Sequence, residues 1–151
     1  MSTLRAKNFS WVVVADESKA IFYTRESRTG PMTEAFVLTN SVAREKAGDL
    51  LADTGGRSFD SHGHGRHTMS KEKTGPKQHA SEVFAKEIAR YLEKGQHSGS
   101  FREFALVVAP KFLGTLRTAL GSGHKLEPSV SVAKQFVGED LAVIAKHVDN
   151  A

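Results

Sequence analysis

The chain has 151 residues, of which 39% are hydrophobic, and it carries a formal net charge of +4 with no cysteine. This length and apolar content suffice for one domain with a single core. The absence of cysteine excludes disulfides, thiolate metal sites and cysteine nucleophiles, while the positive charge favours anionic partners.

Three apolar segments near the start of the chain predict an antiparallel meander. Residues 11–15 form a β-branched apolar run that ends at Asp16, which is typical of a buried central strand. Residues 20–24 and 35–39 predict two further strands, separated from each other by a polar turn. Because the links are short, we expect neighbouring antiparallel strands.

No strand pattern is present between residues 40 and 78, although a helical turn over 42–51 is compatible with the sequence. A segment of this length without regular structure is uncommon in one domain and is usually functional or disordered. We therefore expect a long functional loop at about residues 40–78.

A helix follows this segment. Phe84, Ile88, Tyr91 and Leu92 share one face at helical spacing, and Gly95 predicts the end of the helix.

Alternating strands and helices complete the chain. Residues 103–109 predict a second buried strand, and Pro110 opens a helix that ends at Gly121. Residues 130–137 predict the last strand. Leu141, Ile144, Ala145 and Val148 predict a terminal helix with Glu139 and Asp140 in its first turn, where acids suit the helix dipole.

This order predicts an α/β fold with a ribonuclease H-like mixed sheet, in which a three-strand antiparallel meander joins parallel strands and helices flank the sheet. Residues 1–151 form a single domain in this prediction. The first strand should neighbour strand 103–109, which places a ligand crevice at the switch point near Asp16, Pro110 and Lys111.

The run from Gly55 to His67 is rich in glycine, histidine and arginine, a composition that packed helices and strands rarely use. Gly55 and Gly56 allow the backbone to enter a narrow polyanionic cleft, and Arg57 follows them. The simpler alternative is a flexible turn. If the run binds RNA, the basic side chains contact phosphate and the aromatic one stacks on a base. The candidate RNA-binding residues are Arg57, Phe59, Arg66, His67, Lys71, Lys73 and Lys77.

Metal binding is a weaker interpretation of the same run. His62, His64 and His67 lie close together, but their spacing matches no familiar metal signature, and Arg66 opposes a cation. We expect neither a metal nor a cofactor.

Asp16 lies where ribonuclease H-type enzymes place a metal-binding carboxylate. Two-metal chemistry needs several converging acids, however, and the second buried strand ends in Ala109, Pro110 and Lys111. We interpret Asp16 as a turn or capping residue. The sequence has no hydrolase, phosphate-loop or dinucleotide fingerprint.

The segments 11–16, 20–22, 55–60, 66–67 and 107–114 together resemble the bacterial family described as "protein required for attachment to host cells", over nearly the whole chain. That family in turn resembles the middle domain of archaeal and eukaryotic class I release factors and of Pelota. In the release factors, a Gly-Gly-Gln loop enters the peptidyl transferase centre.

The resemblance implies that Gly55 and Gly56 correspond to the two glycines and that Arg57 replaces the glutamine. The backbone amide of Arg57 can still stabilise negative charge, but the guanidinium is better suited to clamping a phosphate. The tentative catalytic residues are accordingly Gly55, Gly56 and Arg57. Any enzymatic activity would be peptidyl-tRNA ester hydrolysis.

The leading functional hypothesis is a ribosome- or tRNA-binding protein that acts in translation rescue, release or hibernation. The alternatives are a non-enzymatic interaction protein in bacterial attachment to host cells and a metalloprotein that uses the histidine run. With no signal peptide or membrane span in the sequence, we expect a cytoplasmic protein without a membrane partner.

Overall fold

The computed structural model describes residues 7–40, 62–121 and 125–151, with side chains from residue 75 onward in the long first helix. Within these residues five strands form one sheet in the order β3-β2-β1-β4-β5. The strands are β1 (Asn8–Ala15), β2 (Lys19–Arg25), β3 (Thr33–Thr39), β4 (Phe101–Val108) and β5 (Val130–Ala133).

The sheet is mixed, as the sequence predicts. β1, β2 and β3 form the antiparallel meander, while β1, β4 and β5 run parallel to one another. The parallel pair in the centre has the most apolar sequence, because both of its faces are covered. Val12, Val13 and Val14 of β1 and Leu106 of β4 are completely buried. This is the ribonuclease H-like arrangement expected from the element order.

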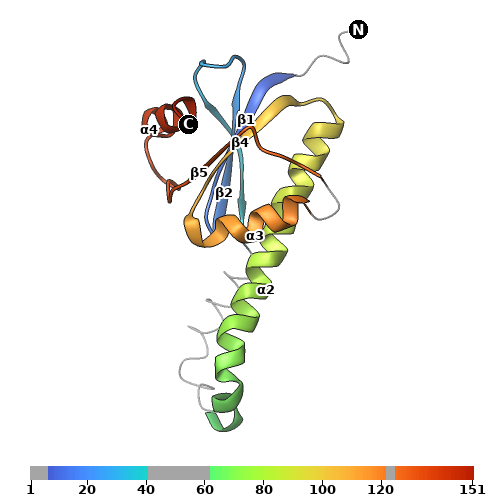
Figure 1. Ribbon diagram of the computed structural model, residues 1–151, viewed down its shortest axis with the longest axis vertical. Helices are drawn as coiled ribbons and strands as arrows, with labels where there is room; N and C mark the ends of the chain where they lie inside the picture. The colour runs from blue at the N-terminus through green and yellow to red at the C-terminus, as the bar shows by residue number, and fades with distance from the viewer. Residues whose placement is uncertain (1–6, 41–61, 122–124) are drawn as a thin grey trace.

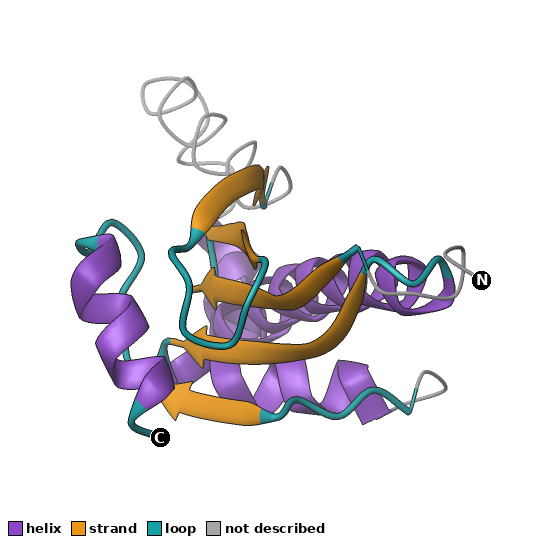
Figure 2. Ribbon diagram, turned by 90° about the horizontal axis from the view of Figure 1, so that it is seen from above, coloured by secondary structure: helices purple, strands orange, loops and turns teal. Residues whose placement is uncertain are grey.

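Helices cover both faces of the sheet (Figures 1 and 2). On one face, α2 (His62–His97) and α3 (Pro110–Gly121) enclose the larger core, which includes Phe22, Phe84 and Phe112. On the other face, α4 (Leu141–Asp149) covers a smaller core through Ile144 and Val148. The predicted helices that begin at Pro110 and at Leu141 are therefore confirmed.

The structure differs from the sequence prediction between residues 62 and 78, where we expected a loop. α2 begins at His62 and includes Pro76. Glycine and proline disfavour helix interiors, which explains the prediction, but propensity is a weak guide when tertiary packing anchors one end of a helix. Packing against the sheet begins at Ala80, and the preceding turns extend away from the sheet (Figure 1).

The end of α2 also differs from the prediction, since Gly95 does not terminate the helix. The helix continues to His97, and Gly99 adopts the positive φ of 70° that is typical of a residue just beyond a helix end. Gly95 is instead required by close approach. A Cβ atom there would lie 2.7 Å from Cε2 of Phe101 and 2.8 Å from Cη2 of Trp11.

Two smaller corrections concern the end of the chain. β5 ends at Ala133 rather than at residue 137, and Phe136 and Val137 pack against the smaller core outside the strand. Asp140 is the N-cap of α4, so Glu139 and Asp140 precede the first turn instead of lying in it. Asp140 makes no side-chain capping hydrogen bond.

Candidate functional site

A crevice lies at the carboxyl ends of β1 and β4, where the sequence placed the switch point. Pairing between the two strands is extended by the amide of Ala109, which donates to the carbonyl of Ala15 at 3.0 Å. The chain then leaves in opposite directions, toward the β1–β2 turn and into α3. The crevice has a volume of about 540 Å³ and is lined by Asp16, Glu17, Ser18, Ala109, Pro110, Lys111 and Gln135.

Asp16 forms the β1–β2 turn that makes one wall of this crevice. Its Oδ1 accepts hydrogen bonds from the amide of Ser18 at 2.8 Å, the hydroxyl of Ser18 at 2.9 Å and the amide of Lys19 at 2.9 Å. Its Oδ2 accepts a bond from Nε2 of Gln135 at 3.1 Å. These bonds hold the tight connection between two antiparallel strands.

The same contacts set the ionisation of Asp16. Partial burial raises its pKa, but the hydrogen bonds from Ser18, Gln135 and Lys19 stabilise the carboxylate, and the net result is a pKa below the usual 3.8. Three of the four hydrogen bonds to Asp16 come from its own turn. The interpretation of Asp16 as a turn residue is confirmed.

Asn40 links the β1–β2 turn to α2 through hydrogen bonds. Its Nδ2 donates to the carbonyl of Glu17 at 2.9 Å and to that of Ala80 at 3.4 Å, and its amide donates to the carbonyl of Ser18 at 2.9 Å. Asn40 therefore joins the end of β3, the β1–β2 turn and the point where α2 meets the sheet. The only sign of this role in the sequence is a polar amide directly after an apolar strand.

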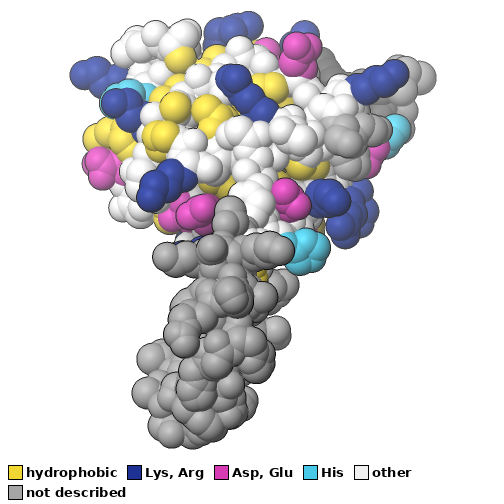
Figure 3. Space-filling view, turned by 60° about the horizontal axis from the view of Figure 1, so that its bottom comes forward, with side chains coloured by type: hydrophobic (Ala, Val, Ile, Leu, Met, Phe, Trp, Pro, Cys, Tyr) yellow, Lys and Arg dark blue, Asp and Glu magenta, His cyan; other side chains and the backbone are white. Residues whose placement is uncertain are grey.

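A groove between α2 and α3 continues the crevice. It has a volume of about 630 Å³, and Pro110 and Lys111 line both hollows. Its walls come from Gln78, Glu82 and Lys86 of α2 and from Gly114, Thr115, Thr118 and Ala119 of α3. We call the crevice and the groove together the carboxyl-edge surface. Figure 3, which turns the bottom of Figure 1 toward the viewer, shows Lys and Arg side chains with acidic ones among them.

The predicted site residues have different places in the structure. Gly55, Gly56, Arg57 and Phe59 lie outside the described residues. The backbones of six others belong to α2, and this group comprises His62, His64, Arg66, His67, Lys71 and Lys73. Lys77 is exposed on α2, close in sequence to the groove residue Gln78. The RNA-binding and catalytic predictions for these residues therefore stay predictions.

The part of the chain with described side chains contains no cluster of three or more His, Asp or Glu residues able to hold a metal ion. Among the described helices, none combines the length and the apolar character needed to cross a membrane.

Comparison with known proteins places this architecture in a family. A family model described as "Protein required for attachment to host cells" matches residues 11–148, from β1 to α4. No curated protein matches the chain. The match covers every strand from Trp11 onward and both helical layers, so the chain belongs to the family of proteins required for attachment to host cells.

Proposed function

We propose that this protein is a non-enzymatic interaction protein that serves the attachment of bacteria to host cells or its regulation. The observation that carries the proposal is the family match over residues 11–148. We assign the contact region for this role to the carboxyl-edge surface. Its two hollows share Lys111, and the carboxylate of Asp16 is used in hydrogen bonds that hold the β1–β2 turn. Exposed loops and edges on a rigid sheet commonly carry binding function.

The test is adherence to cultured host cells by a strain that lacks the gene. Re-expression of the wild-type protein should restore adherence, whereas a Lys86→Glu, Lys111→Glu double variant should not. Both lysines are exposed and line the groove. The matched control is Arg90→Glu with Lys146→Glu, which makes the same charge change on exposed residues outside the carboxyl-edge surface.

Immunoblots must show equal amounts of the two double variants. Unchanged adherence of the deletion strain would contradict the attachment role. Full restoration by the Lys86→Glu, Lys111→Glu variant would instead contradict the assignment of the surface.

Ribosome or tRNA binding is the second candidate function. It is supported by the position of Gly55, Gly56 and Arg57 between β3 and the start of α2 in a ribonuclease H-like sheet. In the resemblance to release factors, this position corresponds to the loop that enters the peptidyl transferase centre. Arg57 and Arg66 would contact phosphate, so binding should weaken steeply with salt.

Sedimentation with ribosomes at low and high salt tests this second candidate. The wild type should pellet with ribosomes at low salt, and an Arg57→Ala, Arg66→Ala variant should stay in the supernatant. An Arg90→Ala, Arg117→Ala variant is the matched control because both arginines are exposed on the described helices. Wild type that stays in the supernatant with both vacant and stalled ribosomes would exclude this candidate. If binding occurs, peptide release from peptidyl-tRNA tests for the associated hydrolase activity.

We also propose a cytoplasmic location, which ribosome binding requires. Cell fractionation tests it, and recovery of the protein in the envelope or the medium would contradict it.

A further inference from the structure

The outer side of β3 is an unpaired strand edge. β3 is the last strand of the sheet and, within the described residues, pairs only with β2. Five of its seven residues are exposed, whereas the opposite edge strand, β5, has four residues, of which three are partly buried. An unpaired edge offers backbone N–H and C=O groups to a further strand. β3 is therefore the longer and more accessible of the two edges.

Apolar side chains flank this edge on both faces of the sheet. On the side of the larger core, Phe36 is only partly buried, and its ring centroid lies 5.2 Å from that of Tyr91, which is 39% exposed. On the side of the smaller core, Val37 pairs with Ile21 and is 40% exposed. Val37 and Tyr91 are two of the four large apolar residues that the described part of the chain exposes. A further strand beside β3 would cover apolar surface on both faces.

β3 has few of the features that protect edge strands from pairing. Natural edges usually carry a lysine, a proline or a bulge. Residues 35–39 contain no charge and no proline. A register shift is present opposite Phe22 and Tyr23, but residues 36–39 pair regularly with β2. This regular segment is suited to accept another strand.

The two ends of β3 carry opposite charges. Glu34 lies near the amino-terminal end, and Lys19 of β2 pairs with Thr39 at the other end. Both charged side chains are exposed, and neither forms an ion pair with another described residue. They share the face of the smaller core, because Lys19 alternates with Ile21 and Tyr23 along β2, while burial and the charge of Glu34 raise the pKa of Tyr23. Five residues of strand, about 16 Å, separate the two charges within one molecule.

We propose that β3 pairs antiparallel with β3 of a second copy of this chain, so that two five-stranded sheets form one continuous sheet. A two-fold axis perpendicular to the sheet closes this pair and keeps each face continuous. It also brings Glu34 of each copy toward Lys19 of the other on the same face. Parallel pairing would instead place the two Glu34 side chains at one end, where like charges repel. The charges thus favour a second copy in antiparallel orientation.

This inference goes beyond the attachment role and uses none of the residues that line the carboxyl-edge surface. Dimerisation is measured on the purified protein, so its outcome is separate from that of the adherence experiment.

Sedimentation equilibrium of the full chain over a range of micromolar concentrations tests the proposal. The wild type should form dimers. Val37→Lys should raise the dimer dissociation constant at least tenfold, because it places a charge within the paired segment. The matched control is Leu141→Lys, since Leu141 is 38% exposed and belongs to α4, which packs on β4 and β5. This control should dimerise like the wild type, and circular dichroism checks that both variants are folded.

Reversal of the two charges tests the antiparallel orientation. Glu34→Lys and Lys19→Glu should each weaken the dimer several-fold, because each puts like charges together at both symmetric contacts. The double variant restores opposite charges and should recover most of the wild-type affinity. Because the two charges are far apart within one molecule, this recovery requires contact between copies. Both positions are exposed, so the measurement does not depend on whether Val37→Lys folds.

Three results would overturn the proposal. The first is a wild type that stays monomeric at every concentration. The second is a folded Val37→Lys variant that dimerises like the wild type, which would place the interface elsewhere. The third is a double charge variant that dimerises no better than the single variants, which would exclude the antiparallel pairing of β3.

Discussion

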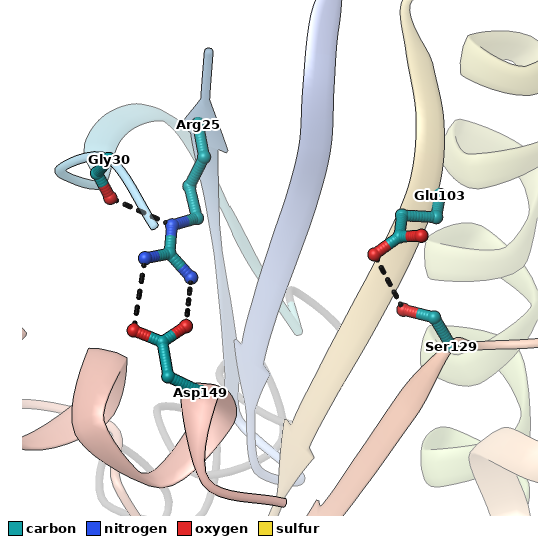
Figure 4. A network of polar contacts seen from close by, with 5 residues as sticks. All are labelled: Arg25, Gly30, Glu103, Ser129 and Asp149. Atoms are coloured by element: carbon teal, nitrogen blue, oxygen red, sulfur yellow. Dashed lines mark hydrogen bonds and ion pairs between the residues drawn. The ribbon is translucent and has the colours of Figure 1, made fainter. Parts of the chain in front are cut away.

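The two ends of the sheet place charged groups in contrasting environments. At the amino ends of β1 and β4, Arg25 is buried and pairs with Asp149, a residue 124 positions away in the chain (Figure 4). At the carboxyl end, Asp16 accepts bonds from neutral donors, two and three positions away in its own turn and 119 positions away at Gln135, and Lys111 stays exposed. The buried ion pair contributes to the tertiary structure, whereas the hydrogen bonds of Asp16 lie beside an exposed surface that stays available for binding. The following predictions test this contrast, from the largest expected effect to the smallest.

Packing at the carboxyl end should depend mainly on apolar contacts. Phe84 of α2 is 1% exposed and stacks on Phe112 of α3, with ring centroids 5.9 Å apart. Phe84→Ala should lower the free energy of unfolding by about 3–5 kcal/mol, measured by urea denaturation, because it leaves a cavity between the helices and the sheet. The neighbouring Val83 is 38% exposed, so Val83→Ala is the control and should lower the free energy of unfolding much less. Equal losses in the two variants would contradict the proposed packing.

Stability at the amino end should depend on the buried ion pair. Arg25→Ala leaves Asp149 without its partner and removes the bond to Gly30, so unfolding should become easier by about 3 kcal/mol. The value lies near the lower end of the range for buried pairs because Asp149 is 35% exposed and can be hydrated. Urea denaturation measures the effect against Arg90→Ala, a change at an exposed arginine.

The double substitution Arg25→Met with Asp149→Leu removes both charges of the pair. Comparing its unfolding free energy with that of Arg25→Ala distinguishes loss of the whole pair from loss of one partner. Apolar replacement of both members of a buried pair is often neutral, so the double variant should recover much of the stability lost in Arg25→Ala. A double variant as unstable as Arg25→Ala would mean that the hydrogen bond to Gly30 or packing, rather than the unpaired charge, dominates.

The Asp16 turn should contribute a smaller, pH-dependent stabilisation. Its folded-state pKa lies below 3.8, so the stabilisation is present above the unfolded-state pKa and is lost as the pH falls through the folded-state value. Asp16→Ala should therefore lower the free energy of unfolding by about 1 kcal/mol near neutral pH, which is typical of losing a capping side chain, and by less in strong acid. Urea denaturation at several pH values checks this trend. A difference from wild type that grows on acidification would contradict the assignment.

The smallest effect is expected at the groove of the carboxyl-edge surface. Gly114 lies inside α3, and a Cβ added there would meet no heavy atom within 4 Å. Gly114→Ala should raise the unfolding free energy by up to about 1 kcal/mol because alanine has the higher helix propensity. Gly95→Ala is the matched contrast and should destabilise, since its Cβ would collide with the rings of Phe101 and Trp11. Thermal unfolding of the two variants should show shifts of opposite sign.

Local patterns were sufficient to predict the sheet. The β-branched run 11–15 and the apolar segment at 103–109 identified its two central strands, and their adjacency placed the crevice near Asp16 and Lys111. The same reasoning could not locate the start of α2, because Gly75 and Pro76 break the pattern before the packed residues begin at Ala80. It also assigned Gly95 to a helix end, although the role of that glycine depends on two rings that lie far away in the sequence.

The polar anchors were missed for a different reason. Arg25 and Asp149 look like ordinary surface residues in the sequence, and only the register of β2 and the end of α4 bring them together. Asn40 similarly finds its partners Glu17 and Ala80 in two other elements, the β1–β2 turn and α2, which lie 23 and 40 positions away in the chain. Pairing over such separations leaves no periodic signal. The Gly55 to Arg57 prediction rests on resemblance and awaits the ribosome experiment.

The close approach at Gly95 also has a practical consequence. Trp11 is the single tryptophan of the chain, and its ring lies against Gly95 of α2 and at a 52° tilt to the ring of Phe101. Indole emission responds to the packing and polarity around the ring, so any shift of α2 relative to the sheet changes the native fluorescence of the protein. The fluorescence of Trp11 therefore reports the position of α2 on the sheet, and ligand titrations can be followed without attaching a dye.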